Sequence, residues 1–240
     1  QPVPGPTNEK YIQSEVAAGR HVMPIMFATN GVDVALCIDA ATGKTLWRKV
    51  IPGGRYFAMD GRQGSTKGWY TTNLATANGR VYFGTSTDVE YCLDAETGET
   101  IWKRTLGPTS GRIVIGDVML RAEADLIGYD AETGETHWTI EDAGAKYALP
   151  LRWMHDGKAY VLAGNENGEI RLVDPADGEV LWKLDNAGTN DMTMSARDEF
   201  LLCNGKKDDK GPGALTGYRI DLQGAERLWS IDSETLQYRP

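Results

Sequence analysis

The sequence contains nearly the same nine residues twice, as "DAETGETIW" at 94–102 and as "DAETGETHW" at 130–138. Three more divergent copies exist, "DAATGKTLW" (39–47), "DPADGEVLW" (174–182) and "DLQGAERLW" (221–229). Asp and Trp are eight residues apart in every copy, and five of the seven tryptophans are used in this way. Successive copies of this Trp lie 55, 36, 44 and 47 residues apart. The chain is therefore a repeat protein with a period of a few tens of residues.

The local chemistry of the phrase predicts a β-hairpin. An apolar or alternating run such as "VEYCLD" (89–94) ends on the Asp, and a second run such as "ETIWKRT" (99–105) follows the Gly. Two such runs around a short turn indicate paired strands. The Asp carboxylate is suited to accept hydrogen bonds from backbone N–H groups two or three residues further on, and Gly supplies the positive φ of the turn.

Two further strand-like runs precede each hairpin, with turns expected at Asn78-Gly79 and Asp156-Gly157. No segment shows a sustained helical period, so each repeat is interpreted as one four-stranded antiparallel blade. A sandwich would show strands without a shared phrase, so the predicted fold is an all-β propeller. We expect one propeller domain over 1–240, with five complete blades and residues 233–240 as the start of a further blade; the blades are placed at 9–50, 68–106, 109–141, 146–185 and 190–232.

The pattern Ala-x-Asp-x-x-x-Gly-x-x-x-Trp resembles the tryptophan-docking motif of the pyrroloquinoline quinone (PQQ) propellers, and the resemblance covers nearly the whole chain. It implies that each repeat Trp stacks on the peptide near the Gly of a neighbouring blade, which ties the blades together. The residues concerned are Trp47, Trp102, Trp138, Trp182 and Trp229.

The repeats depart from this motif at its small first position, which holds Cys37, Cys92, Gly128, Leu172 and Arg219 in the five copies. The last two residues are bulky, and the fifth copy has Gly-Ala at 224–225 in place of Thr-Gly. Looser or differently packed docking is therefore expected in the last two blades. PQQ-like propellers have seven or eight blades, so the resemblance implies a segment of a larger ring; the alternative is a five-bladed ring closed by the termini.

Composition limits the possible partners. The formal net charge is −9, so the chain repels phosphate backbones and nucleic-acid binding is not expected. Glycine makes up 28 of 240 residues, which suits many tight turns. No stretch approaches 18 consecutive apolar residues, so no membrane span is expected. The proline-rich start "QPVPGPTNEK" suits a mature chain or a fragment of a longer one.

The three cysteines are expected to be structural. Cys37 and Cys92 occupy the same position in successive blades. Sheets packed face to face lie about 10 Å apart, whereas a disulfide needs Cα atoms within about 7 Å. We therefore expect buried thiols that fill the small-residue position, and Cys203 has no evident disulfide mate.

Two insertions fall on the face that carries the blade crossovers, at 51–70 and at 203–215. Long loops on a rigid scaffold often carry recognition. A solvated crossover is the plainer interpretation of the first insertion. The alternative is a partner-binding surface, and its candidate residues are Arg55, Tyr56, Asp60, Arg62, Lys67 and Trp69. In the second loop, Asp208 and Asp209 lack the spacing of a known calcium site.

A central channel would be lined by the first strand of each blade. If a cofactor is bound, it is expected over residues from these strands, although an empty or water-filled channel is the plainer interpretation. The candidates are Tyr70, Thr72, Asn73, Lys146, Tyr147, Asn190 and Met192.

The resemblance also raises a PQQ-dependent dehydrogenase, in which adjacent cysteines and a Trp enclose the quinone beside a calcium or lanthanide ion. The chain has neither a Cys-Cys pair nor a Cys-x-x-Cys-His haem motif. His21, His137 and His155 are scattered, and His137 is expected to pack beside its Trp. The repeat Asp residues are expected to be structural, so no catalytic residue and no metal ligand is assigned.

We therefore expect a non-catalytic PQQ-like propeller that acts as an extracytoplasmic, periplasmic, binding or assembly scaffold, similar to the propeller lipoprotein that helps insert outer-membrane proteins. Its partners would be proteins or further blades, and no cofactor is predicted. The alternative is part of a PQQ-dependent quinoprotein dehydrogenase, or a relative with a modified site, that binds PQQ and calcium.

Overall fold

The computed structural model describes residues 15–17, 20–27, 32–52, 74–85, 88–107, 111–145, 149–187, 193–206 and 213–232. The described part is built of β-strands and turns, with no helix, as the sequence predicts. No helix that could cross a membrane is found in that part. The chain divides into two compact units, Gln1–Thr109 and Ser110–Pro240. The expected start of a further blade, residues 233–240, lies outside the described residues.

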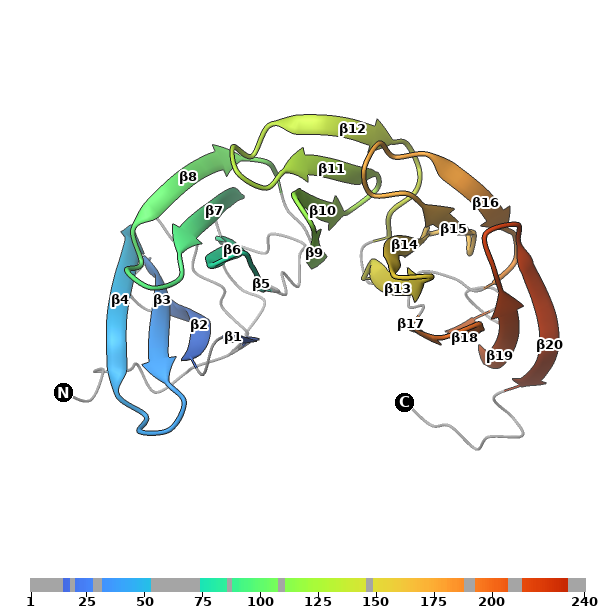
Figure 1. Ribbon diagram of the computed structural model, residues 1–240, viewed down its shortest axis with the longest axis horizontal. Helices are drawn as coiled ribbons and strands as arrows, with labels where there is room; N and C mark the ends of the chain where they lie inside the picture. The colour runs from blue at the N-terminus through green and yellow to red at the C-terminus, as the bar shows by residue number, and fades with distance from the viewer. Residues whose placement is uncertain are drawn as a thin grey trace, which may run out of the picture. The chain divides into compact units, whose positions relative to one another are not determined.

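The first unit holds two four-stranded antiparallel sheets, and in each the strands are hydrogen-bonded in chain order (Figure 1). The first sheet consists of β1 (Glu15–Ala17), β2 (Arg20–Phe27), β3 (Val32–Asp39) and β4 (Thr45–Pro52). The second consists of β5 (Ala75–Ala77), β6 (Arg80–Gly84), β7 (Val89–Asp94) and β8 (Thr100–Thr105). We call these sheets blades one and two.

The second unit holds three sheets of the same design, blades three to five. Blade three consists of β9 (Gly111–Ile115), β10 (Val118–Ala122), β11 (Leu126–Asp130) and β12 (Thr136–Ile140). Blade four consists of β13 (Leu151–His155), β14 (Lys158–Gly164), β15 (Ile170–Val173) and β16 (Val180–Leu184). Blade five consists of β17 (Thr193–Arg197), β18 (Phe200–Lys206), β19 (Gly213–Ile220) and β20 (Ala225–Asp232).

The tight turns between first and second strands follow from their residues. Asn78 and Gly79 have φ of 52° and 72°, and Asp156 and Gly157 have φ of 47° and 78°. Two successive positive φ angles are the signature of the two-residue hairpin turn that Asn-Gly and Asp-Gly favour. Both turns predicted from the sequence are confirmed.

Burial shows why the middle strands are apolar. All four side chains of β15 are buried, because blade three packs on one face of this strand and blade five on the other. All five side chains of β10 are buried as well. The fourth strands are mostly exposed; in β8 only Trp102 is buried. The Trp is thus the point at which the fourth strand joins the core.

A β-bulge precedes every repeat Trp. In blade two, Cys92 pairs with Trp102 and Leu93 pairs with Thr100, so Ile101 between them has no partner across the ladder. The other four blades skip the equivalent residue in the same way. A bulge re-aims the side chains on either side of it. The bulged residues are Leu46, Ile101, His137, Leu181 and Leu228.

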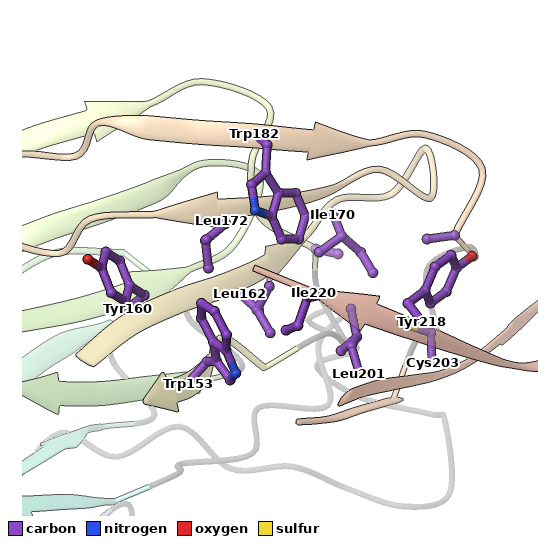
Figure 2. Packing of buried hydrophobic residues seen from close by; sticks show 12 residues of the cluster. Trp153, Tyr160, Leu162, Ile170, Leu172, Trp182, Leu201, Cys203, Tyr218 and Ile220 are labelled. Carbon is purple, nitrogen blue, oxygen red and sulfur yellow. The ribbon is translucent and has the colours of Figure 1, made fainter. Parts of the chain in front are cut away.

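The cores lie between consecutive blades. In unit one, Ala35 and Cys37 of blade one pack with Val81 and Phe83 of blade two. In unit two, one cluster joins blades three and four and another joins blades four and five. Figure 2 shows the last of these, with Leu162 and Trp182 of blade four facing Leu201 and Ile220 of blade five.

Candidate functional site

The Asp of the repeat organises its own turn, as the sequence predicts. One carboxylate oxygen of Asp94 accepts hydrogen bonds from the N–H groups of Glu96 (3.0 Å) and Thr97 (2.7 Å) and from the Thr97 hydroxyl (2.9 Å). The same Thr hydroxyl oxygen accepts the N–H of Glu99 at 3.2 Å. This network satisfies the N–H groups of Glu96, Thr97 and Glu99 from within the turn, and the N–H of Ala95 bonds to the carbonyl oxygen of Gly79. The carboxylate is therefore a structural element.

The first described junction between blades is made by Trp47. Its indole Nε1–H donates to the carbonyl oxygen of Ala95, in the turn of blade two, at 3.1 Å. Its ring covers Gly98, where an added Cβ would lie 2.6 Å from a ring carbon. Lys49 adds a hydrogen bond from its ammonium to the Gly98 carbonyl at 3.2 Å. The glycine is thus required both for its φ of 73° and for the ring above it.

Trp138 repeats this arrangement between blades three and four. Its Nε1–H donates to the carbonyl oxygen of Pro175 at 3.1 Å, and a Cβ added to Gly178 would lie 2.7 Å from its ring. On its own sheet the ring lies across Gly128, where a Cβ would approach to 2.2 Å. The small first position of the motif therefore leaves room for the indole.

The junction between blades four and five keeps the hydrogen bond from the repeat Trp, but the bond goes to a different backbone carbonyl. Trp182 is buried, and its Nε1–H donates to the carbonyl oxygen of Asp221 at 2.7 Å. The acceptor moves by one residue because the turn of blade five is two residues shorter: the N–H of Asp221 bonds to Gly224 three residues on, whereas that of Asp174 bonds to Glu179 five residues on. Docking beside Leu172 is therefore packed differently rather than loosened, which is one of the two expected outcomes.

The shorter turn also corrects the alignment of the fifth repeat. The sequence places Arg219 at the small first position, but Arg219 pairs with Glu226, and Gly217 pairs with Trp229. A Cβ on Gly217 would lie 2.5 Å from the Trp229 ring. The small residue is therefore present, two positions earlier than the constant Asp-to-Trp spacing indicates.

Sequence reasoning missed a second kind of docking tryptophan. Trp153, in the first strand of blade four, is buried and donates its Nε1–H to the carbonyl oxygen of Asp198 in blade five at 2.6 Å (Figure 2). Its ring stacks on His155 with centroids 5.0 Å apart. Trp153 is not part of the repeated phrase, and its place in a strand of alternating apolar and polar residues is the only indication in the sequence that it is buried. Blades four and five are thus joined by two indoles.

Polar side chains also join blades three and four, at the segment that connects β12 to β13. Asn165, which is buried, donates from Nδ2 to the carbonyl oxygen of Asp142 at 2.9 Å, while its Oδ1 accepts the N–H of Glu169 at 2.9 Å. Arg171 donates to the carbonyl oxygen of Glu141 at 2.9 Å and pairs with Glu169. These side chains tie the blade-four turn to the preceding crossover, which gives them a structural role.

The cysteines are buried, reduced thiols. Cys37 and Cys92 pair across the ladder with Trp47 and Trp102, which confirms their assignment to the small-residue position. Burial raises the pKa of Cys92 and of Cys203 to about 12. Both thiols are therefore protonated at neutral pH and unreactive.

His137 does not pack beside its Trp, contrary to expectation. It is the bulged residue of blade three, its side chain is exposed, and Nε2 lies 3.3 Å from a carboxylate oxygen of Asp130. Burial alone would raise the pKa of Asp130, but hydrogen bonds from Thr133 and His137 outweigh it, so the pKa ends below its ordinary value of 3.8. The histidine supports the turn carboxylate.

Asp174 also forms an ion pair with a residue outside its own turn. Its carboxylate is bonded to the ammonium of Lys158 on β14 and to the N–H of Ala176. Burial raises the pKa of Asp174, but the bonds from Lys158 and Ala176 outweigh it, and the pKa ends below 3.8. The hydrogen bond to Asp174 in turn raises the pKa of Lys158.

This pairing predicts a pH dependence. A lowered folded-state pKa contributes stability that is present above 3.8 and is lost as the pH falls through the folded-state value. Asp174→Asn should therefore lower the urea midpoint at pH 7, and the difference from the native protein should shrink at pH 3.5. Asp156→Asn is the control, since that side chain is 94% exposed. A constant difference from pH 7 to pH 3 would contradict the role of the Asp174 charge.

The structure does not test the candidate recognition residues. The loop residues Arg55, Tyr56, Asp60, Arg62, Lys67 and Trp69 lie outside the described residues, and so do the channel candidates Tyr70, Thr72, Asn73, Lys146, Tyr147, Asn190 and Met192. Both sets remain predictions. Among the residues that are described, no three His, Cys, Asp or Glu side chains gather as a metal-binding group.

Comparison with known proteins identifies the repeats. The family model described as outer membrane protein assembly factor BamB matches residues 32–208. Polyvinylalcohol dehydrogenase of Sphingopyxis sp. (strain 113P3) is 31% identical over 230 residues, covering 82% of this chain and 33% of that protein. The dehydrogenase subunit of alcohol dehydrogenase (quinone) of Komagataeibacter europaeus is 31% identical over 140 residues, covering 48% and 18%. Outer membrane protein assembly factor BamB of Yersinia pestis is 25% identical over 168 residues, covering 66% and 40%.

A solved structure agrees on the fold. BamB from Moraxella catarrhalis superposes with a TM-score of 0.58 at 17% identity, covering 92% of this chain and 72% of that one. The chain spans 40% or less of the length of the three relatives named above. Its four-stranded blades, docking indoles and Asp-capped turns are those of a β-propeller of PQQ-like repeats. The chain therefore belongs to the PQQ-repeat family whose model is described as outer membrane protein assembly factor BamB.

Proposed function

We propose that the chain is a non-catalytic propeller that serves as an extracytoplasmic scaffold for binding and assembly. The observation that carries the proposal is that the repeated polar groups are engaged in the fold. Each repeat carboxylate accepts a backbone N–H of its own turn, as seen at Asp39, Asp94, Asp130, Asp174 and Asp221. Groups used in this way hold loops in place and are not available as general bases.

The described residues do not fit the thiol pair that the resemblance assigns to a PQQ site. Cys37, Cys92 and Cys203 lie in β3, β7 and β18, which belong to three different sheets. All three are buried in those sheets. A ring of adjacent cysteines against a quinone therefore has no counterpart among them, and we derive no chemical step through this cofactor.

The partner surface of the scaffold is proposed in the insertion that follows β4, at residues 55–69. Its residues Arg55, Tyr56, Arg62 and Trp69 are of the types that dominate binding energy at protein interfaces. The family model and the Yersinia pestis relative both carry the name of an outer-membrane-protein assembly factor, which supports a client or an assembly partner in that process.

Complementation tests this proposal. The chain, exported to the periplasm of a bacterium that lacks its own assembly factor of this family, is expected to raise the amount of folded outer-membrane porin. Replacing 55–69 by a Gly/Ser loop of equal length should abolish the gain, whereas the same replacement at 207–212 should not. Porin levels unchanged by the chain, or unchanged by the loop replacement, would refute the proposed surface.

A quinoprotein dehydrogenase is the second candidate. It is favoured by the relatedness to polyvinylalcohol dehydrogenase and to alcohol dehydrogenase (quinone). The purified chain should be titrated with PQQ and calcium and then assayed for dye reduction with ethanol and with polyvinyl alcohol. The scaffold proposal predicts neither stoichiometric binding nor reduction; a bound quinone with alcohol-dependent turnover would establish the second candidate instead.

A further inference from the structure

The two-residue turn between β5 and β6 of blade two consists of Asn78 and Gly79 (Figure 1). Both residues are exposed. An Asn followed by Gly is chemically labile, because the backbone nitrogen of the next residue can attack the Asn side chain and a Gly does not hinder that approach. The other described turns between first and second strands contain no Asn; they are formed by Gly116-Asp117, Asp156-Gly157 and Asp198-Glu199.

The described part of the chain holds three Asn-Gly pairs, and they differ in the bonding of the Gly nitrogen. In Asn167-Gly168, the Gly N–H donates to the carbonyl oxygen of Asn165 at 3.2 Å. Asn204-Gly205 lies within β18, which is paired with β17 and β19. In contrast, no acceptor among the described residues takes the N–H of Gly79. A fourth pair, at residues 30–31, lies outside the described residues.

The strand before Asn78 is also easy to detach. Ring closure between the Gly nitrogen and the Asn side chain requires the tight turn to open. β5 has three residues and pairs on one side only, with β6, so opening this turn breaks few hydrogen bonds. β18 has seven residues and a strand on each side. Local opening costs less free energy where fewer backbone bonds must break, so Asn78 is the most accessible of the three to this chemistry.

The turn is connected to the docking indole of blade one by two hydrogen bonds. The carbonyl oxygen of Gly79 accepts the N–H of Ala95 at 2.9 Å. The carbonyl oxygen of Ala95 in turn accepts the Nε1–H of Trp47 at 3.1 Å. The conformation at Gly79 therefore helps to fix the peptide on which blade one docks.

We propose that Asn78 is a deamidation site whose reaction weakens the junction between blades one and two. The Gly79 nitrogen loses its proton and attacks Cγ of Asn78. The N–Cγ bond forms, the Cγ–Nδ2 bond breaks and ammonia leaves, which gives a succinimide ring. Water then opens the ring, either at Cγ to give aspartate or at the backbone carbonyl to give isoaspartate. The net reaction consumes one water, releases one ammonia and needs neither an oxidant nor a cofactor.

The two products differ in their effect on the turn. Aspartate preserves it, because Asp156-Gly157 forms the same turn with φ of 47° and 78°. Isoaspartate carries the main chain through its side-chain methylene, so the loop gains a carbon and no longer fits the register of β5 and β6. The Gly79 carbonyl then moves away from Ala95. The inference concerns the chemical ageing of blade two and is independent of the partner surface at 55–69.

Peptide mapping by mass spectrometry tests the site. The full chain is incubated at pH 9, and isoaspartate is identified by labelling with an isoaspartyl methyltransferase. Asn78 should deamidate at least about tenfold faster than Asn167 and Asn204, which serve as controls within the same sample. In urea the three rates should converge, because the dipeptide is the same. If Asn78 reacts no faster than the other two in the folded chain, the turn protects it and the proposal is wrong.

Thermal unfolding tests the link to the junction. Aged protein with isoaspartate at 78, separated by chromatography, should have a Tm lower by about 4 °C or more than fresh protein. Asn78→Asp, aged alongside, undergoes every other change of ageing and should stay within about 1 °C of its fresh form. In Trp47→Phe, which lacks the indole donor, isoaspartate should cause at most about half the loss. An unchanged Tm, or an equal loss with and without the indole, would show that the reaction does not reach the junction.

Discussion

Gly178→Ala is expected to destabilise the protein by about 3–4 kcal/mol, against about 1–2 kcal/mol for Gly157→Ala. Both glycines have φ of 78°, so the backbone strain of an alanine is matched. They differ in their surroundings: a Cβ at Gly178 lies 2.7 Å from the Trp138 ring, whereas at Gly157 it meets nothing within 4 Å. The difference therefore isolates the displacement of a docked indole. Urea unfolding followed by fluorescence measures it.

Unit one offers an independent repeat of this experiment. Gly98 and Gly79 have φ of 73° and 72°, and only Gly98 lies under an indole, that of Trp47. Gly98→Ala should again cost about 2 kcal/mol more than its partner substitution. Equal costs within each pair would mean that the rings do not rest on the glycines, and the account of the junctions would fail.

Trp182→Ala is expected to cost about 3–5 kcal/mol, because it removes a large side chain from the cluster between blades four and five. Trp182→Phe keeps a ring but removes the donor to the Asp221 carbonyl, and should cost about 1–3 kcal/mol. The measurement is the free energy of unfolding from denaturant titration.

The matched control is Trp229→Ala, the same substitution at the same repeat position. Trp229 is 41% exposed, against 8% for Trp182, so its loss should cost about 1 kcal/mol or less. If the two alanine variants are equally unstable, burial between blades is not what makes the indole stabilising.

The fold was predictable because its instructions are local. An Asp that bonds to amides two and three residues away, and a Gly with φ near 70°, produce the same turn wherever they occur, so the repeated phrase alone indicates hairpins and blades. The spacing from Asp94 to Trp102 is preserved in all copies and located the tryptophans of the repeat, although not Trp153.

The sequence did not reveal the change of strand register in blade five. The fifth turn is two residues shorter, yet the distance from Asp221 to Trp229 is unchanged, so counting residues assigns Arg219 where pairing places Gly217. The role of Trp153 could not be predicted, because its acceptor is the backbone carbonyl of Asp198 and any residue type could supply that carbonyl. The candidate recognition loops have no repeated pattern at all, so their roles rest on residue types.

The bulged residue before each docking Trp is a suitable site for attaching a label. The two phrases at 94–102 and 130–138 differ only where one has Ile101 and the other His137, and both are bulged residues with exposed side chains. Such a position is released from the core, so it accepts chemically unlike side chains. Since burial holds the native thiols Cys92 and Cys203 at a pKa of about 12, a cysteine introduced at Leu46 or His137 gives a selective attachment point for a spin label or fluorophore, one per blade.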